Sequence, residues 1–108
     1  PEQLRAVVQV IRRLRPSLLF IPYWEERHPD HVATSRLCEK ATFFSGLRHW
    51  HPELGAAHTV DQILFFMMRV EGPWSFIVDT TETFQRKVEA CRIFSSQVTP
   101  DRAAASAG

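Results

Sequence analysis

The chain has 108 residues, which suffices for one small domain, and its 44% apolar and 23% charged residues are ordinary for a globular protein. Its formal net charge of +1 gives no bulk attraction to nucleic acid or to a membrane surface. The longest apolar run, residues 63–68, is far shorter than the roughly 18 residues that a membrane span needs. We therefore expect a cytoplasmic protein without nucleic-acid or membrane partners.

The first residue is Pro1, and no signal-peptide pattern follows it. We therefore expect the sequence to begin inside a longer protein. Two cysteines, Cys38 and Cys91, lie far apart within helix-like patterns. We expect both to be reduced and packed, although a disulfide between them stays an open alternative.

Apolar residues recur at helical spacing near the start of the chain and predict an amphipathic helix over about 2–14, which Pro16 ends. Its polar face is predicted to carry Arg5, Gln9, Arg12 and Arg13. The next run, residues 17–22, is almost entirely apolar and fits a strand that is buried on both faces, as in parallel sheets. A helix followed by such a strand is typical of an α/β fold.

A polar segment, residues 24–31, directly follows that predicted strand. In open α/β sheets, ligands bind at the carboxyl ends of the strands. Asp30 is a suitable N-cap for a helix over about 31–45, and Gly46 is a natural stop for it. The segment is therefore predicted to form a loop at the ligand-binding edge of the sheet.

In the second half of the chain, the pattern of apolar residues and breaks predicts a long loop over 47–61 and two further strands, near 62–68 and 75–79. A last helix near 82–94 is predicted to be capped by Asp79 or Thr80. Residues 99–108, rich in Ala, read as a frayed end or a linker. The fold class that follows is α/β, with a mostly parallel sheet flanked by helices.

The chemistry-bearing residues of the loop are His28, Asp30 and His31, with Pro29 stiffening the turn. Imidazole nitrogen and carboxylate oxygen are both standard zinc ligands. Two histidines at this spacing alone are more often incidental surface residues than a metal site. The position after a buried strand favours a site.

The run from Tyr23 to His31 resembles the second signature of LmbE/PIG-L zinc-dependent deacetylases. It is most similar to the bacillithiol-pathway branch, which deacetylates N-acetylglucosaminyl-malate. Further matching segments follow in family order: Ala33, Ser35 and Leu37, then 44–48, 75–79, 86–90 and Ser96-Gln97. The resemblance implies a Rossmann-like fold, with residues 1–98 as the C-terminal portion of the deacetylase domain.

The resemblance also implies a role for each residue of the loop. His31 corresponds to the signature's zinc ligand. His28 corresponds to the histidine that stabilises the tetrahedral intermediate or protonates the leaving amine, and Asp30 to the aspartate that sets its orientation and charge. Arg27 could bind a carboxylate of the substrate with its two-pronged donor geometry, or pair with Glu25 or Glu26 on the surface. Zinc, the implied cofactor, would polarise the amide and activate water.

The sequence departs from the family in lacking its first signature, a His-Pro-Asp-Asp run that supplies the other two zinc ligands and the general base. His51-Pro52-Glu53 comes after the second signature and is judged unrelated. The expected parent protein is thus an enzyme acting on an N-acetylglucosaminyl small molecule, and the fragment alone is expected to be inactive. Alternatives are a branch acting on a mycothiol precursor or glycolipid, and a non-catalytic module that serves homo-oligomer contacts.

Two other groups of residues stay open at this point. Arg48, His49, Trp50 and His51 form a basic and aromatic cluster in the long loop, where Trp50 could stack on a sugar or plug the edge of the core. His58 could be structural or solvated.

Overall fold

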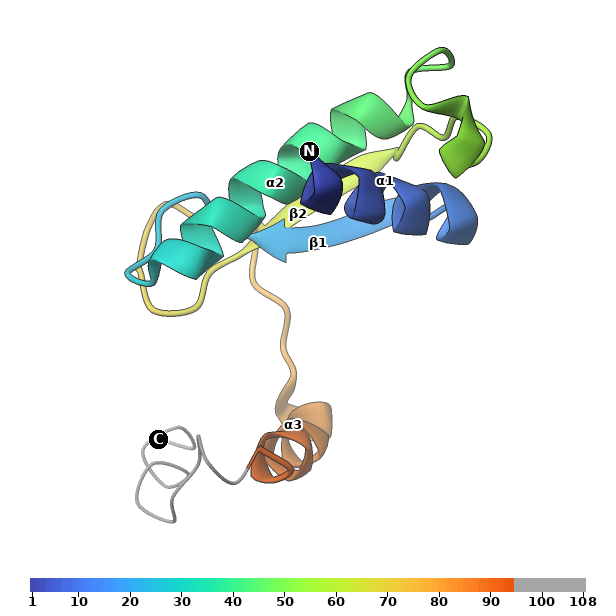
Figure 1. Cartoon of the computed structure of the whole chain (residues 1–108). Coiled ribbons are helices and arrows are strands. Elements are labelled where there is room, and N and C mark those ends of the chain that lie inside the picture. Colours follow the sequence, from blue (N-terminus) through green and yellow to red (C-terminus); the bar gives the residue numbers. More distant parts are fainter. Residues whose placement is uncertain (95–108) are drawn as a thin grey trace. The chain divides into compact units, whose positions relative to one another are not determined.

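The computed structural model describes residues 1–94, which divide between two units, the first Pro1–Gly72 and the second beginning at Pro73. The first unit contains helix α1 (Glu2–Leu14), strand β1 (Leu18–Pro22), helix α2 (Pro29–Ser45), the short 3₁₀ helix η1 (Pro52–Leu54) and strand β2 (Gln62–Phe66). Figure 1 shows these elements along the chain. The predicted first helix and the predicted strand over 62–68 are confirmed.

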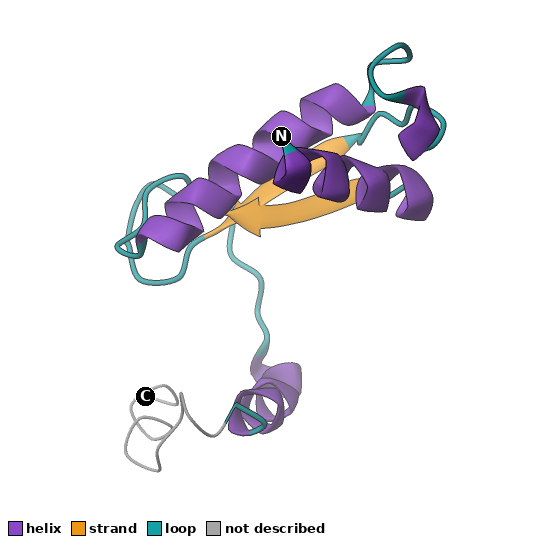
Figure 2. Ribbon diagram, viewed as in Figure 1, coloured by secondary structure: helices purple, strands orange, loops and turns teal. Residues whose placement is uncertain are grey.

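The two strands form a parallel sheet, with Leu18 opposite Gln62 and Pro22 opposite Phe66. Helix α2 joins them, as a parallel pair requires. Helices α1 and α2 lie side by side on one face of the sheet, which Figure 2 shows by colour. The expected α/β class, with a parallel sheet and flanking helices, is therefore confirmed.

The core of the first unit lies between the two helices and the sheet. Its buried centre consists of Val8 and Ile11 from α1, Ala41 from α2 and Val60 from the segment before β2. Seven partly buried apolar side chains pack around it: Leu4, Val7, Leu19, Phe44, Trp50, Leu54 and Ile63. This cluster fixes how α2 crosses the sheet, and therefore where its first turn lies.

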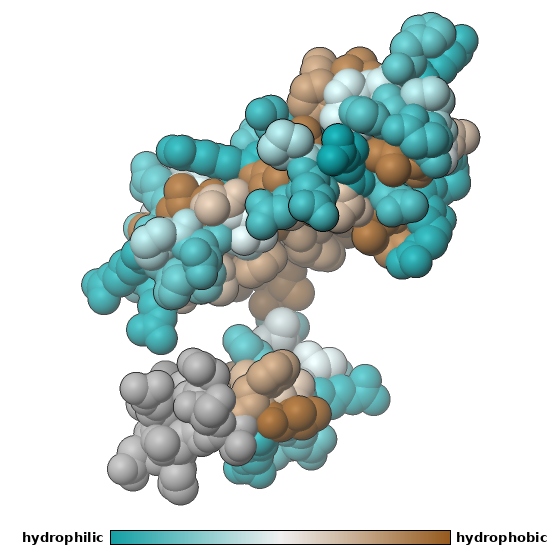
Figure 3. Space-filling view, viewed as in Figure 1, coloured by the Kyte–Doolittle hydropathy of each residue, from teal (hydrophilic) through white to brown (hydrophobic). Residues whose placement is uncertain are grey.

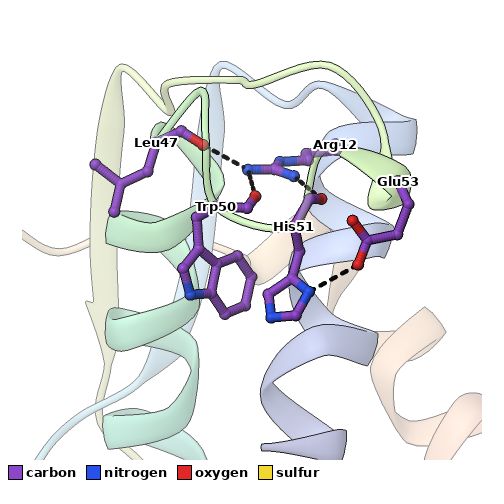
Figure 4. A network of polar contacts seen from close by, with 5 residues as sticks. All are labelled: Arg12, Leu47, Trp50, His51 and Glu53. Carbon is purple, nitrogen blue, oxygen red and sulfur yellow. Dashed lines mark hydrogen bonds and ion pairs between the residues drawn. The ribbon is translucent and has the colours of Figure 1, made fainter.

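Arg12 does not lie on the polar face of α1, where the helical pattern placed it. Its side chain is only 3% exposed. The guanidinium donates hydrogen bonds to five backbone carbonyls at and beyond the end of α2, those of Phe44, Ser45, Leu47, Trp50 and His51. Figure 4 shows three of these acceptors around the guanidinium. The prediction was wrong because carbonyls left unpaired at a helix end can satisfy a buried cation.

Strand β1 is not buried on both faces. Ile21 is 1% exposed, whereas Phe20 beside it is 60% exposed and Leu18 is 39% exposed. Both helices cover the same side of the sheet, so alternate side chains of β1 face away from them. The side of the first unit seen in Figure 3, on which the helices lie, is largely hydrophilic. The sheet face opposite the helices is therefore apolar and uncovered within the described part of the chain.

The second unit, as far as it is described, contains the 3₁₀ helix η2 (Thr81–Thr83) and helix α3 (Phe84–Arg92). The predicted helix is thus confirmed, but residues 75–79 do not form the predicted strand. Phe76, Ile77 and Val78 are exposed, and no strand among residues 1–94 pairs with them. An apolar run alone does not make a strand, because the ladder needs a partner for its hydrogen bonds.

Asp79 accepts hydrogen bonds from the backbone N–H and the hydroxyl of Thr81, so it begins the turn before α3 rather than capping α3 itself. Ser96-Gln97 and the predicted tail over 99–108 lie outside the described residues. Within residues 1–94, no helix is long and apolar enough to cross a membrane.

Both cysteines are free thiols. Cys38 is half-buried in α2, and this burial raises the pKa of its thiol. Cys91 is exposed on α3, so the expected packing of this thiol is not found.

Candidate functional site

The polar loop leaves β1 at the same edge of the sheet where the chain leaves β2. The N–H of Tyr23 donates to the carbonyl of Phe66 at 2.9 Å, which extends the pairing by one residue beyond the strand. The loop over 24–28 and the loop that begins at Met67 therefore start side by side. This edge holds every residue that the sequence singled out as a candidate for catalysis or metal binding.

His28 caps helix α2, which begins at Pro29 rather than at His31. The Nδ1 atom of His28 accepts a hydrogen bond from the N–H of Asp30 at 3.1 Å. Pro29 suits the first helical position, where its missing N–H has no helical partner to lose. The predicted cap, Asp30, lies instead in the first turn, where its negative charge favours the positive end of the helix dipole. The imidazole nitrogen takes the place that a side-chain oxygen usually has at a cap.

The structure brings His28, Asp30 and His31 together. The rings of His28 and His31 stack with centroids 5.0 Å apart at 22°. The Nδ1 atom of His28 lies 3.9 Å from Oδ2 of Asp30, and both side chains are largely exposed. The cap requires a lone pair on Nδ1, so in this arrangement a neutral His28 carries its proton on Nε2. The Nε2–H group is therefore the donor that His28 can offer to a ligand.

His31 differs from His28 in its surroundings. Its ring is half-buried, and its Nδ1 atom is buried without a hydrogen-bond partner. The Nε2 atom is consequently the nitrogen available to a ligand at the sheet edge.

Arg27 is held in the loop through its backbone, whose N–H donates to the Glu26 carboxylate at 3.1 Å. The Arg27 side chain is exposed and forms no ion pair with Glu25 or Glu26 within residues 1–94. The guanidinium therefore remains available to a ligand. Of the two alternatives for Arg27, substrate binding requires this availability.

Glu26 has a larger structural part in the site than the sequence suggested. Its Oε2 atom accepts from the N–H of Arg69 at 3.3 Å, so its carboxylate joins the two loops that follow the strands. Desolvation acts to raise the pKa of Glu26, but the N–H groups of Arg27 and Arg69 and the nearby imidazole of His31 together lower it. The feature of the sequence that could have indicated a role for Glu26 is its position, directly after a buried strand and before two histidines.

The zinc ion that the family resemblance implies would find one suitable imidazole ligand among the described residues. The buried, unpartnered Nδ1 of His31 leaves Nε2 open, which suits one imidazole ligand. Within residues 1–94, no group of three or more His, Cys, Asp or Glu side chains is placed to hold a metal ion. The donor set of the described chain thus fits the single ligand that the family resemblance implies, and does not complete a tetrahedral site.

Trp50, His51 and His58 make structural contacts in the loop after α2, whereas Arg48 and His49 are exposed. Trp50 stacks on Phe44, with ring centroids 4.8 Å apart at 29°, and packs against the core. The Nδ1 atom of His51 lies 2.7 Å from the Glu53 carboxylate. His58 donates from Nε2 to the carbonyl of Pro16 at 2.7 Å. Trp50 therefore packs at the edge of the core, and His58 links the loop by a hydrogen bond to the segment just before β1.

Comparison with known proteins places this geometry in a larger fold. No protein-family model matches the sequence. The chain is similar to the conserved protein TT1542 from Thermus thermophilus, with a TM-score of 0.86 and 35% sequence identity. The match covers 97% of this chain and 48% of TT1542. The chain has half of an LmbE-like fold. It spans about half the length of TT1542, so the arrangement around β1 and α2 is one part of that fold.

Proposed function

We propose that this chain is the C-terminal part of a zinc-dependent deacetylase domain of the LmbE/PIG-L kind. The reaction is the removal of the acetyl group from an N-acetylglucosaminyl conjugate. The supporting observation is that His28, Asp30 and His31 gather where β1 ends and α2 begins, in a chain that matches half of an LmbE-like fold. The remaining metal ligands and the general base would come from residues outside this sequence.

In this proposal His31 is one metal ligand through Nε2, and the metal, when bound, polarises the amide and activates water. His28 acts on the substrate itself. Its Nε2–H is not used by the cap and donates a hydrogen bond to the amide oxygen as negative charge develops there. The departing amine then needs a proton, which a protonated His28 can give. Asp30 lies close enough to receive the Nδ1–H of that protonated ring after a small rotation.

The proposed substrate is N-acetylglucosaminyl-malate, with the exposed Arg27 binding a malate carboxylate. In the full-length protein we expect zinc-dependent release of acetate from this compound. Arg27→Ala should raise KM for the malate conjugate by about tenfold, since one charge-assisted contact is lost, and leave KM for an uncharged N-acetylglucosaminyl conjugate unchanged. Equal effects on both compounds would remove the malate assignment. Zinc-loaded protein that releases no acetate from any N-acetylglucosaminyl compound would remove the whole proposal. A preference for a mycothiol precursor or a glycolipid would move the protein to another branch.

The isolated 108-residue chain should bind zinc only weakly, because a single imidazole is available at the site. Calorimetric titration with zinc, repeated on His31→Ala, measures this directly. Stoichiometric binding with a submicromolar Kd that His31→Ala abolishes would contradict the proposal, since it would require a complete site within this chain.

A second candidate function, a non-catalytic module that forms homo-oligomers, is favoured by the uncovered face of the sheet. Leu18, Phe20 and Phe66 are all substantially exposed, and the register places them on the same face of the sheet. Apolar surface of this kind associates in water. The occupant that we propose for this function is the same face of a second copy.

Under that second candidate the 108-residue chain should sediment as a dimer or larger species, and Phe20→Lys should shift it to the monomer. Leu14→Lys, which also changes a strongly exposed apolar residue but lies at the end of α1, is the matched control and should leave the assembly unchanged. A wild-type chain that remains monomeric at high concentration would exclude this function.

A further inference from the structure

The hydroxyl of Ser35 behaves differently from the other hydroxyls of α2. This helix carries two threonines and two serines, and three of the four donate to a carbonyl one turn earlier. Thr34 donates to Asp30 at 2.7 Å, Thr42 to Cys38 at 2.7 Å, and Ser45 to Thr42 at 2.9 Å. Ser35 is 0% exposed, yet its Oγ atom has no hydrogen-bond partner. A buried hydroxyl without a partner is costly, so a specific one is expected.

A candidate for the missing partner lies one turn earlier on the helix. Among the described residues, only one other buried side-chain polar atom lacks a hydrogen bond, and it is Nδ1 of His31. Residues four apart on a helix share a face, and side chains lean toward the N-terminus of the helix. The Ser35 side chain therefore lies over the turn that carries His31. The Glu26 carboxylate is near the His31 imidazole, but it accepts from the N–H groups of Arg27 and Arg69 and forms no hydrogen bond with Nδ1.

We propose that Ser35 is a positioning residue that holds His31 in the Nδ1–H tautomer. In this arrangement His31 Nδ1–H donates to Ser35 Oγ, and the Ser35 hydroxyl donates to the His31 carbonyl, as Thr34 and Thr42 do with the carbonyls four residues before them. This pairing gives each of the two unpartnered atoms a hydrogen-bond partner. The consequence is a lone pair on His31 Nε2, which is the nitrogen left open at the sheet edge.

The two neighbouring histidines are then fixed in opposite tautomers. His28 accepts at Nδ1 from the Asp30 N–H, so its Nε2 carries a proton and donates. His31 donates at Nδ1 to Ser35, so its Nε2 has a free lone pair. One ring is thereby prepared to donate a hydrogen bond and the other to bind an electrophile. The use of that lone pair for a metal rests on the proposed function, whereas the tautomer itself does not.

The test is the tautomer of His31 in the metal-free 108-residue chain, read from two-bond ¹H–¹⁵N correlations of the imidazole at a pH where the ring is neutral. His31→Gln assigns the signals. The wild-type chain should show His31 mainly as Nδ1–H. Ser35→Ala removes the acceptor, and Ser35→Cys keeps the shape with a much weaker one. Each should lower the ratio of Nδ1–H to Nε2–H by about tenfold, the factor expected for one net hydrogen bond.

Ser45→Ala is the matched control, because Ser45 is equally buried on the same helix but bonds to Thr42 and His58. It should leave the His31 tautomer unchanged. A wild-type His31 in the Nε2–H form would overturn the proposal, and so would a ratio that Ser35→Ala and Ser35→Cys do not change. If the full-length protein releases no acetate while the tautomer still follows Ser35, only the proposed function fails.

Discussion

Replacing His28 by Ala in the full-length protein should lower kcat by about 10²–10⁴-fold, the span expected for losing a general acid, while zinc content stays near that of the wild type. In the proposed function, His28 acts on the substrate and does not bind the metal. His31→Ala should instead lose the zinc and with it the activity. Metal content measured beside kcat separates the two roles.

The structure sharpens this experiment, because His28 is also the N-cap of α2. His28→Ala should lower the free energy of unfolding by about 0.5–2 kcal/mol through loss of the cap. His28→Asn keeps a good cap but supplies no titratable acid, so it should restore the stability and not the rate. A His28→Asn variant with near wild-type kcat would show that His28 contributes through the helix alone.

Asp30 provides the third arm of the experiment. Asp30→Asn keeps the backbone N–H that bonds to His28 and removes the carboxylate that lies 3.9 Å from Nδ1. The variant should retain its zinc but lose rate, because no carboxylate remains beside Nδ1 to orient the His28 ring. A zinc-free His28→Ala, or a His31→Ala that keeps its zinc and activity, would reverse the assigned roles.

Arg12→Met should lower the free energy of unfolding of the first unit by about 2–4 kcal/mol, a large part of the stability of a small domain. Methionine keeps most of the packing of the side-chain stem, so the decrease in unfolding free energy reports mainly the loss of the hydrogen bonds. The guanidinium reaches five carbonyls over distances of 2.8 to 3.3 Å, and without it the end of α2 and the following loop lose their shared donor. Urea unfolding followed by circular dichroism gives the free energy.

The matched control is the neighbouring Arg13, which is exposed on α1. Arg13→Met should change the free energy of unfolding by no more than about 0.5 kcal/mol. Arg12→Lys should recover little of the lost stability, since an ammonium group cannot reproduce the planar set of five N–H donors of a guanidinium. If Arg12→Met unfolded with the same free energy as Arg13→Met, the carbonyls would have to be satisfied in another way.

The elements of the first unit could be predicted because their hydrophobic patterns agree with local packing. The apolar runs at 17–22 and 62–68 contain both strands, and the helical spacing before Pro16 contains α1. The start of α2 was missed by two residues because an imidazole that accepts a hydrogen bond can cap a helix as a carboxylate does. The sequence-based pattern counts only the common cap residues.

Other errors arose from interactions between distant parts of the chain. Arg12 has the spacing of a surface residue, and only the carbonyls more than thirty residues later explain its burial. The run 75–79 has strand-like residues but no partner strand among residues 1–94. In the site, the resemblance named His28, Asp30 and His31, whereas the bridging contact of Glu26 with Arg69 depends on the pairing of β1 with β2.

The parallel pairing of β1 with β2 also bears on the order in which the molecule folds. All of α2 and the loop after it separate the two strands along the chain. Each ladder hydrogen bond therefore closes a long loop, and its entropy cost favours the local helices forming first and the sheet last. The contact between Glu26 and Arg69 needs the ends of both strands side by side. We therefore expect the edge that gathers the two histidines to assemble late in folding, after the helices that support it.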